Sequence, residues 1–301
     1  MSIQRRLLIA GGIGLLGAHC VVGAQPAATM RRVGILHVGS EAEGAGLRTP
    51  FKQGMNDLGW LEGKNVEYRV AAAAGDVNRL DALARELVEE RVDVIVAPTS
   101  AVTRAAQRAT KTIPIVMTGV ADAVHEGFVV SLARPGGNIT GLSIQAFEVL
   151  AKMIEILHEV TPLSRRFAIL LNENHPSHAL YRAAAQRACD ALGLTAIFVV
   201  ASAPADLARA VEQIVRQRAQ AVVVVADAMY HIERIKLQQL LHATRLPVAV
   251  GHHENVVAGG LLGYTSNYVA NFRYAAKFVD KILKGAKPAD LPVEQPTRFE
   301  L

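Results

Sequence analysis

Short apolar runs alternate with amphipathic helical segments along almost the whole chain, and this alternation constrains the fold more than any other feature. In the first half the predicted strands are 33–38, 66–70, 92–97 and 113–117, and the predicted helices are 50–58, 80–88 and 101–110. Right-handed crossovers between such strands build one parallel sheet with helices on both faces. The sequence therefore predicts an α/β fold.

The same rhythm restarts after Ser143. A long amphipathic helix is predicted over Ala146 to Val160, before further alternating elements. The strands expected there are 167–171, 195–200, 221–225 and 247–250, and the helices are 180–192, 207–215 and 232–243. Periodicity alone thus predicts two α/β units, each a doubly wound parallel-sheet lobe.

The junction between the two series lies in residues 113–143. Its predicted strand is followed by a polar loop with Asp122, and a helical half-turn is expected from the spacing of Phe128, Val129 and Leu132. The turn residues 135–138 then lead to a second short strand, 139–142. This junction marks the expected first crossover between the lobes.

The last third contains three further elements. Leu261 to Tyr264 is predicted to be a strand that returns toward the first lobe. Asn267 is expected to cap a long helix ending near Leu283, with Lys281 in its last turn and Gly285 as a stop signal. Residues 293–301 are expected to cross again toward the second lobe.

Three segments carry a family resemblance. DAVHEGFVVSLARPGGNITGLS (122–143), AGGLLGY (258–264) and KILKGAKPADLPVEQPTRFEL (281–301) resemble the SLARPGGN-containing substrate-binding proteins of bacterial ABC transporters. The resemblance implies a type I periplasmic binding protein fold with crossings near 142, 264 and 294. The implied lobes are 31–142 plus 265–292 and 143–264 plus 293–301. Members of this family usually continue through a further helix, so a closing element beyond Leu301 is expected to be missing.

The first 24 residues are predicted to be a cleaved signal peptide that sends the chain to the periplasm. Arg5 and Arg6 precede an apolar segment that is too short to span a bilayer comfortably, and a small-residue cleavage pattern ends at Ala24. The two arginines are compatible with the twin-arginine or the general secretion route. His19 before Cys20 argues against lipidation, and the GxGxxG string at 12–17 lies inside the signal, so it is not a nucleotide site.

Candidate ligand-binding residues follow the predicted strands, because ligands of open parallel sheets bind at the carboxyl ends of the strands. Thr99 and Ser100 begin a helix and suit a carboxylate, although simple helix capping explains them equally well. Asp122 and Asp227 could pair with a ligand ammonium or sugar hydroxyl, or only close their loops; Asp227 is the preferred ammonium partner. The remaining candidates are Ser40, Asn172, Ser177, Glu254 and Tyr264, of which Tyr264 either stacks on a ligand or packs between lobes.

The sequence contains no recognisable catalytic or metal-binding motif. GxSxG, Walker-type GxxxxGK[ST] and HExxH strings are absent. The pairs His252–His253 and His175–His178 lack ligand spacing, so neither a metal nor another cofactor is expected, and no enzyme activity either. Cys189 on the apolar side of a helix is expected to be a buried thiol.

These observations predict an exported solute-binding protein of an ABC importer. It would close two lobes around an amino acid or similar small carboxylate and deliver it to the ABC permease membrane subunits. A monomer is expected. Nucleic-acid partners are not expected, because removal of the signal peptide with Arg5 and Arg6 leaves 30 basic against 27 acidic residues, which is too balanced for a nucleic-acid surface. The alternative is a periplasmic ligand-sensing domain that signals to a partner instead of delivering to a permease.

Overall fold

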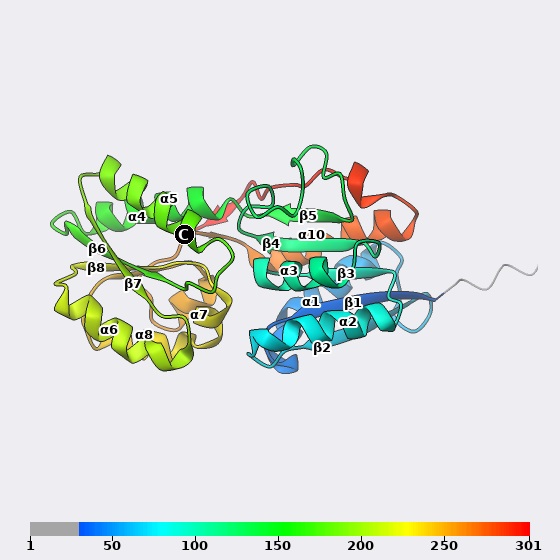
Figure 1. Ribbon diagram of the computed structural model, residues 1–301, viewed down its shortest axis with the longest axis horizontal. Coiled ribbons are helices and arrows are strands. Elements are labelled where there is room, and N and C mark those ends of the chain that lie inside the picture. Colours follow the sequence, from blue (N-terminus) through cyan, green and yellow to red (C-terminus); the bar gives the residue numbers. More distant parts are fainter. Residues whose placement is uncertain (1–29) are drawn as a thin grey trace, which may run out of the picture.

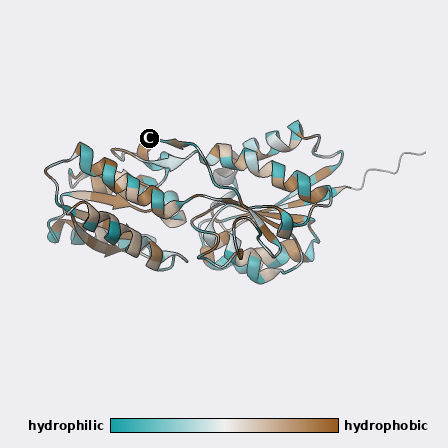
Figure 2. Ribbon diagram, turned by 90° about the horizontal axis from the view of Figure 1, so that it is seen from above, coloured by the Kyte–Doolittle hydropathy of each residue, from teal (hydrophilic) through white to brown (hydrophobic). Residues whose placement is uncertain are grey.

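The computed structural model describes residues 30–301, and the predicted signal peptide lies outside them. Two α/β lobes lie end to end, each with a parallel sheet between helices (Figure 1). The strands of both sheets are largely hydrophobic, and the helices turn hydrophilic faces outward (Figure 2). The predicted fold class is confirmed. No helix among residues 30–301 is long and apolar enough to cross a membrane.

The first lobe is built on a five-stranded sheet of order β2-β1-β3-β4-β5, parallel throughout. Its strands are β1 (Arg31–His37), β2 (Val66–Ala72), β3 (Val94–Ala97), β4 (Ile115–Val120) and β5 (Ile139–Ser143). Its helices are α1 (Glu41–Asp57), α2 (Leu80–Glu89), α3 (Ser100–Ala109) and α10 (Tyr268–Leu283). α2 and α3 contact each other over the sheet, and α1 packs against α10.

The β3 strand shows how this sheet is buried on both faces. Ile95 and Ala97 belong to one apolar cluster, whereas Val94 and Val96 belong to another. Successive side chains of a strand point to opposite faces, so each cluster covers one side of the sheet. An uninterrupted apolar run is therefore what a central parallel strand requires.

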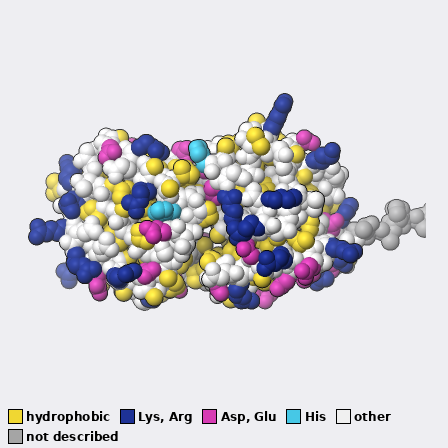
Figure 3. Space-filling model, in the orientation of Figure 1, with side chains coloured by type: hydrophobic (Ala, Val, Ile, Leu, Met, Phe, Trp, Pro, Cys, Tyr) yellow, Lys and Arg dark blue, Asp and Glu magenta, His cyan; other side chains and the backbone are white. Residues whose placement is uncertain are grey.

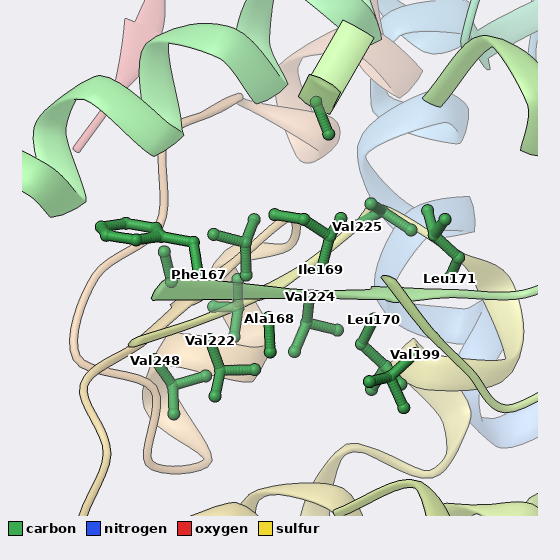
Figure 4. Packing of buried hydrophobic residues seen from close by; sticks show 14 of the residues in the cluster. Phe167, Ala168, Ile169, Leu170, Leu171, Val199, Val222, Val224, Val225 and Val248 are labelled. Atoms are coloured by element: carbon green, nitrogen blue, oxygen red, sulfur yellow. The ribbon is translucent and has the colours of Figure 1, made fainter. Parts of the chain in front are cut away.

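The second lobe is built on a four-stranded parallel sheet of order β7-β6-β8-β9. Its strands are β6 (Arg166–Leu171), β7 (Thr195–Val200), β8 (Ala221–Val224) and β9 (Val248–Val250). Its helices are α4 (Ala146–Val160), α5 (His178–Ala191), α6 (Leu207–Arg216), α7 (Ala228–Ile232), α8 (Arg234–His242) and α9 (His253–Val257). Along β6, Phe167, Ile169 and Leu171 point to one side and Ala168 and Leu170 to the other (Figure 4). Cys189 is fully buried in this core.

Three segments join the lobes. β5 runs on into α4, and the short antiparallel pair β10 (Thr265–Ser266) and β11 (Phe299–Glu300) forms beside it. Glu294 lies next to the end of β5, where its backbone N–H donates to the carbonyl of Gly141 at 2.9 Å. Asn267 caps α10 as predicted, its side chain accepting from the N–H of Ala270 at 2.8 Å.

Three local predictions are wrong. The helix predicted over 50–58 begins much earlier, at Glu41, and takes in the Gly-rich stretch expected to be a loop, because packing of α1 against α10 outweighs the low helix propensity of glycine. Residues 124–130 form turns and bends, and no helical half-turn. Leu262 bridges Ala249 of β9, so 261–264 lies along the second lobe's own sheet instead of returning as a strand to the first lobe.

Candidate functional site

A cavity of about 310 Å³ lies between the lobes. The first lobe lines it with His37, Gly39, Thr99 and Tyr268, and the second lobe with residues of α7 and of the segment after β9. In the space-filling view the lobes meet at a waist (Figure 3). A smaller cavity of about 30 Å³, lined by Ser100, His175 and Asp227 among others, shares Thr99, Ala228, His252 and Tyr268 with the larger one. Together they form one candidate site between the carboxyl ends of two parallel sheets.

Thr99 and Ser100 stand at the beginning of α3, as the sequence predicts. The hydroxyl of Thr99 accepts a long hydrogen bond from the N–H of Val102, at 3.4 Å. The hydroxyl of Ser100 donates to Glu126 at 2.8 Å and accepts from the N–H of Ala121 at 3.2 Å. Ser100 is therefore engaged inside its own lobe, whereas the start of the helix faces the cavity through Thr99.

Glu126 is a residue that sequence reasoning missed. Its side chain is buried, and its Oε1 accepts the Ser100 hydroxyl of its own lobe and, at 2.5 Å, the Ser177 hydroxyl of the other lobe. Its Oε2 is buried without a hydrogen-bond partner among the described residues. In the sequence, Glu126 stands out only as a second acid four residues after Asp122, just before the apolar residues Phe128 and Val129.

Asp227 and Asn172 form a second buried polar pair, in the second lobe. The amide of Asn172 donates to Asp227 Oδ2 at 3.1 Å. The other oxygen of Asp227 caps α7 by accepting the N–H groups of Met229 (2.8 Å) and Tyr230 (3.3 Å). The two side chains are 5% and 8% exposed, so this carboxylate is held rigidly at the wall of the cavity.

Burial keeps the titratable rings of the site uncharged. It lowers the pKa of His252 to about 3, helped by the neighbouring His231 and His175. The pKa of His175 is also lowered, chiefly by burial, although Asp227 and Glu126 act in the opposite direction. Burial raises the pKa of Tyr268, whose hydroxyl donates to the carbonyl of Pro98 at 2.9 Å. Near neutral pH the two imidazoles are neutral and can donate or accept hydrogen bonds.

The other predicted site residues have different surroundings. Asp122 closes its own loop, accepting the N–H groups of Val124 and His125 at 3.0 Å each and contacting the His125 ring at 2.7 Å. Tyr264 stacks on Phe299 with ring centroids 5.5 Å apart, where β10 and β11 pair. Ser40 immediately precedes α1, next to Gly39 of the cavity wall.

Glu254 lines the larger cavity together with two histidines. Donor atoms of His231, His252 and Glu254 all lie within 4.8 Å of one another. Sequence reasoning considered His252 and Glu254 but had no signal for His231, which lies on α7, about twenty residues away in the chain. These three are the residues of the site that could hold a metal ion.

Known proteins resemble the chain over most of its length. A sequence model of the family described as ABC transporter substrate binding protein matches residues 35–301. The tyrosine-binding protein of Clostridioides difficile (strain R20291) is 23% identical over 243 residues, which are 81% of this chain and 70% of that protein.

Solved structures share the fold. A conserved domain protein of Vibrio cholerae superposes with a TM-score of 0.84 at 24% identity, covering 90% of each chain. A Streptococcus pneumonia ABC domain in complex with L-Trp superposes with a TM-score of 0.83 at 20% identity, covering 89% of this chain and 90% of that one.

Proposed function

Because the chain belongs to the ABC transporter substrate binding protein family, whose members bind ligands and are not enzymes, we propose that it binds a free amino acid between its lobes. The ligand would be a small molecule that the protein captures outside the cytoplasm and delivers to an ABC permease. The negative charge of buried carboxylates at the site is the observation that supports an amino acid as the ligand.

Two buried carboxylates lie at or beside the site: Asp227 lines the smaller cavity, and Glu126 accepts a hydrogen bond from Ser100, which lines it. The guanidinium of Arg104 donates to the backbone carbonyl of Glu126 and does not pair with its carboxylate. Among residues 30–301, neither Glu126 nor Asp227 forms an ion pair with Lys or Arg. A buried carboxylate without a counter-charge is costly, and hydrogen bonds alone offset that cost only in part. A ligand ammonium group would supply the missing positive charge, which favours an amino acid over a sugar or a simple carboxylate.

The start of α3 suits the other end of an amino acid. Backbone N–H groups of a first turn have no carbonyl partner within the helix and carry the positive end of the helix dipole. In α3 the Thr99 hydroxyl accepts one of them, from Val102, through a long hydrogen bond of 3.4 Å. Thr99 brings this helix start to the wall of both cavities, so a ligand carboxylate can bind there. The ligand side chain would then extend into the 310 Å³ cavity toward Tyr268 and His252. That two similar proteins bear tyrosine or L-Trp in their names agrees with this class of ligand.

Ligand capture would proceed by hinge closure. We assign residues 31–142 plus 265–292 and 143–264 plus 293–301 to the two moving lobes. Contacts between them include the hydrogen bond from Ser177 to Glu126, the edge contact between the rings of His252 and Tyr268, 5.9 Å apart, and the packing of Ala228 and Ile232 against the apolar core of the first lobe. A ligand that touches both walls would add contacts present only in the closed form, and so raise its population.

The proposal also includes export of the protein through the signal peptide at residues 1–24 and delivery of the bound ligand to a permease. The rival, a sensor domain, would bind the same ligand but would not support uptake. Deleting the gene and measuring uptake of the identified amino acid separates the two. Lost uptake supports delivery, and unchanged uptake with a lost transcriptional response supports sensing.

Calorimetric titration with L-amino acids tests the ligand assignment. Asp227→Asn and Glu126→Gln should each weaken binding of the identified ligand about 10- to 100-fold, as expected for a hydrogen bond to a charged group. Asp122→Asn is the matched control, because this acid also follows a strand but closes its own loop, and it should change affinity less than about twofold. Equal affinity in all three variants, or tight binding of the N-acetylated ligand, would contradict the ammonium assignment.

A further inference from the structure

Three potential metal ligands converge at the second lobe's side of the cavity. His231 lies on α7, His252 immediately precedes α9, and Glu254 is in the first turn of α9. Their donor atoms lie within 4.8 Å of one another, and His231 Nδ1 is 3.9 Å from Glu254 Oε2. The two imidazole rings have centroids 5.2 Å apart. Elements distant in the chain thus bring two nitrogens and one carboxylate together.

We propose that His231, His252 and Glu254 form a binding site for a divalent first-row transition metal, with Zn²⁺ as the representative ion. Two imidazoles and one carboxylate are ligands that Zn²⁺ accepts, and three protein ligands leave a fourth position open. In a tetrahedral site with bonds of about 2.0–2.2 Å, donor atoms lie roughly 3.3–3.5 Å apart. The observed spacing therefore closes with small side-chain rotations, which half-buried residues can make.

The open position faces the interlobe cavity. All three residues line it, opposite His37 and Thr99 of the first lobe. Arg234 also lines this cavity and is the nearby cation that opposes metal binding. Its guanidinium, however, donates to the backbone carbonyl of His231 at 3.0 Å, which anchors it at the end of α7. The metal would therefore present its free coordination position to whatever small molecule enters the cavity.

Zn²⁺ titration of the untagged protein tests the site without any organic ligand, so its result does not depend on the amino-acid proposal. Calorimetry should show one site per chain with micromolar or tighter affinity, reversed by a chelator. His231→Ala, His252→Ala and Glu254→Gln should each weaken it by at least about tenfold. His253→Ala is the matched control, since this histidine is adjacent but exposed and outside the cluster, and it should bind Zn²⁺ like the wild type.

Co²⁺ substitution gives a second measure that needs no variant to fold. The wild-type protein should develop the visible absorption of a tetrahedral or five-coordinate Co²⁺ site, and the His253→Ala protein should keep it. Absence of this band, absence of stoichiometric Zn²⁺ binding, or equal affinity in all four variants would each overturn the assignment. Far-ultraviolet circular dichroism of every variant separates lost binding from lost folding.

Discussion

The two lobes share a parallel α/β design but differ in how the chain builds them. The sheet and the helices of the second lobe come from one continuous stretch, from α4 to α9, whereas the first lobe needs a helix from near the end of the chain. α10 packs on α1 and against β4 and β5, and Trp60 donates to Asp280 across this interface at 2.8 Å. The first lobe therefore cannot complete its core until the second has been synthesised.

The walls of the cavity differ as well. The first lobe contributes the start of α3. Glu126, which lines neither cavity, accepts from Ser100 of α3 and from the N–H of Asp122 and so ties this helix to the loop after β4. The second lobe contributes Asp227 and three of the site's histidines, His175, His231 and His252. The first wall therefore offers a helix start, whereas the second offers a buried carboxylate and a group of imidazoles.

The strongest test of two separate cores compares two phenylalanines. Phe272 of α10 is 2% exposed in the first lobe, and Phe167 of β6 is fully buried in the second. Replacing either with Ala should lower the free energy of unfolding of its own lobe by about 3–5 kcal/mol. Hydrogen exchange should rise in β1, β3 and α1 for Phe272→Ala, and in β6–β9 for Phe167→Ala. Equal loss of protection in both lobes would mean one cooperative unit.

The polar contact between the lobes is tested by Ser177→Ala. Removing a hydroxyl that donates to the buried Glu126 carboxylate should destabilise the closed form by roughly 1.5–3 kcal/mol, because hydrogen bonds to charged groups have this strength. Small-angle scattering without ligand should show a larger radius of gyration than the wild type. Ser202→Ala removes a hydroxyl that accepts from Glu173 within the second lobe only, so it should leave the radius unchanged. Identical scattering for both variants would show that Ser177 does not hold the lobes together.

The interface of α1 with α10 is tested by two glycines of one helix. A Cβ at Gly54 would lie 2.6 Å from the backbone oxygen of Arg273 and 2.9 Å from Ala276 Cβ. Gly54→Ala should lower the free energy of unfolding by about 1–3 kcal/mol through overpacking. A Cβ at Gly46 would meet nothing within 4 Å, so Gly46→Ala should raise it by roughly 0.5–1 kcal/mol. Urea unfolding measures both, and effects of the same sign would refute the close approach.

The smallest effects concern two buried tyrosines in equivalent roles. Tyr230 donates to the carbonyl of Ala201 in the second lobe, and Tyr268 to that of Pro98 in the first, each at 2.9 Å. Tyr230→Phe and Tyr268→Phe should each cost about 0.5–1.5 kcal/mol. Thermal unfolding at neutral pH measures this, and only Tyr268→Phe should also change ligand affinity, because only this ring lines the cavity.

The same tyrosines predict an alkaline limit to stability. Burial raises both pKa values above the ordinary value of 10.0, so the folded protein keeps both hydroxyls protonated. The unfolded chain ionises above pH 10, and the stability present below that pH is lost as pH rises further. Each Phe variant should therefore lose less stability between pH 9 and 11 than the wild type; an identical slope would argue against buried, neutral hydroxyls.

The sequence alone determined the features that depend on local periodicity and chemistry. Uninterrupted apolar runs marked the parallel strands, because a central strand such as β3 is buried on both faces. Asn267 marked the beginning of α10, because its side chain satisfies an N–H of the first turn. The family membership was also evident from residues 122–143.

Tertiary structure decided what depends on partners far away in the chain. The Gly-rich start of α1 became helical because α10 packs on it, and 261–264 aligned with β9 because that edge of the second sheet was open to pairing. Glu126 and His231 gained their importance only from contacts with Ser177 and with His252 and Glu254. Periodicity reports which side of an element is buried, but not which distant side chains contact one another there. The candidate site of this protein consists of side chains from elements that are distant in the chain.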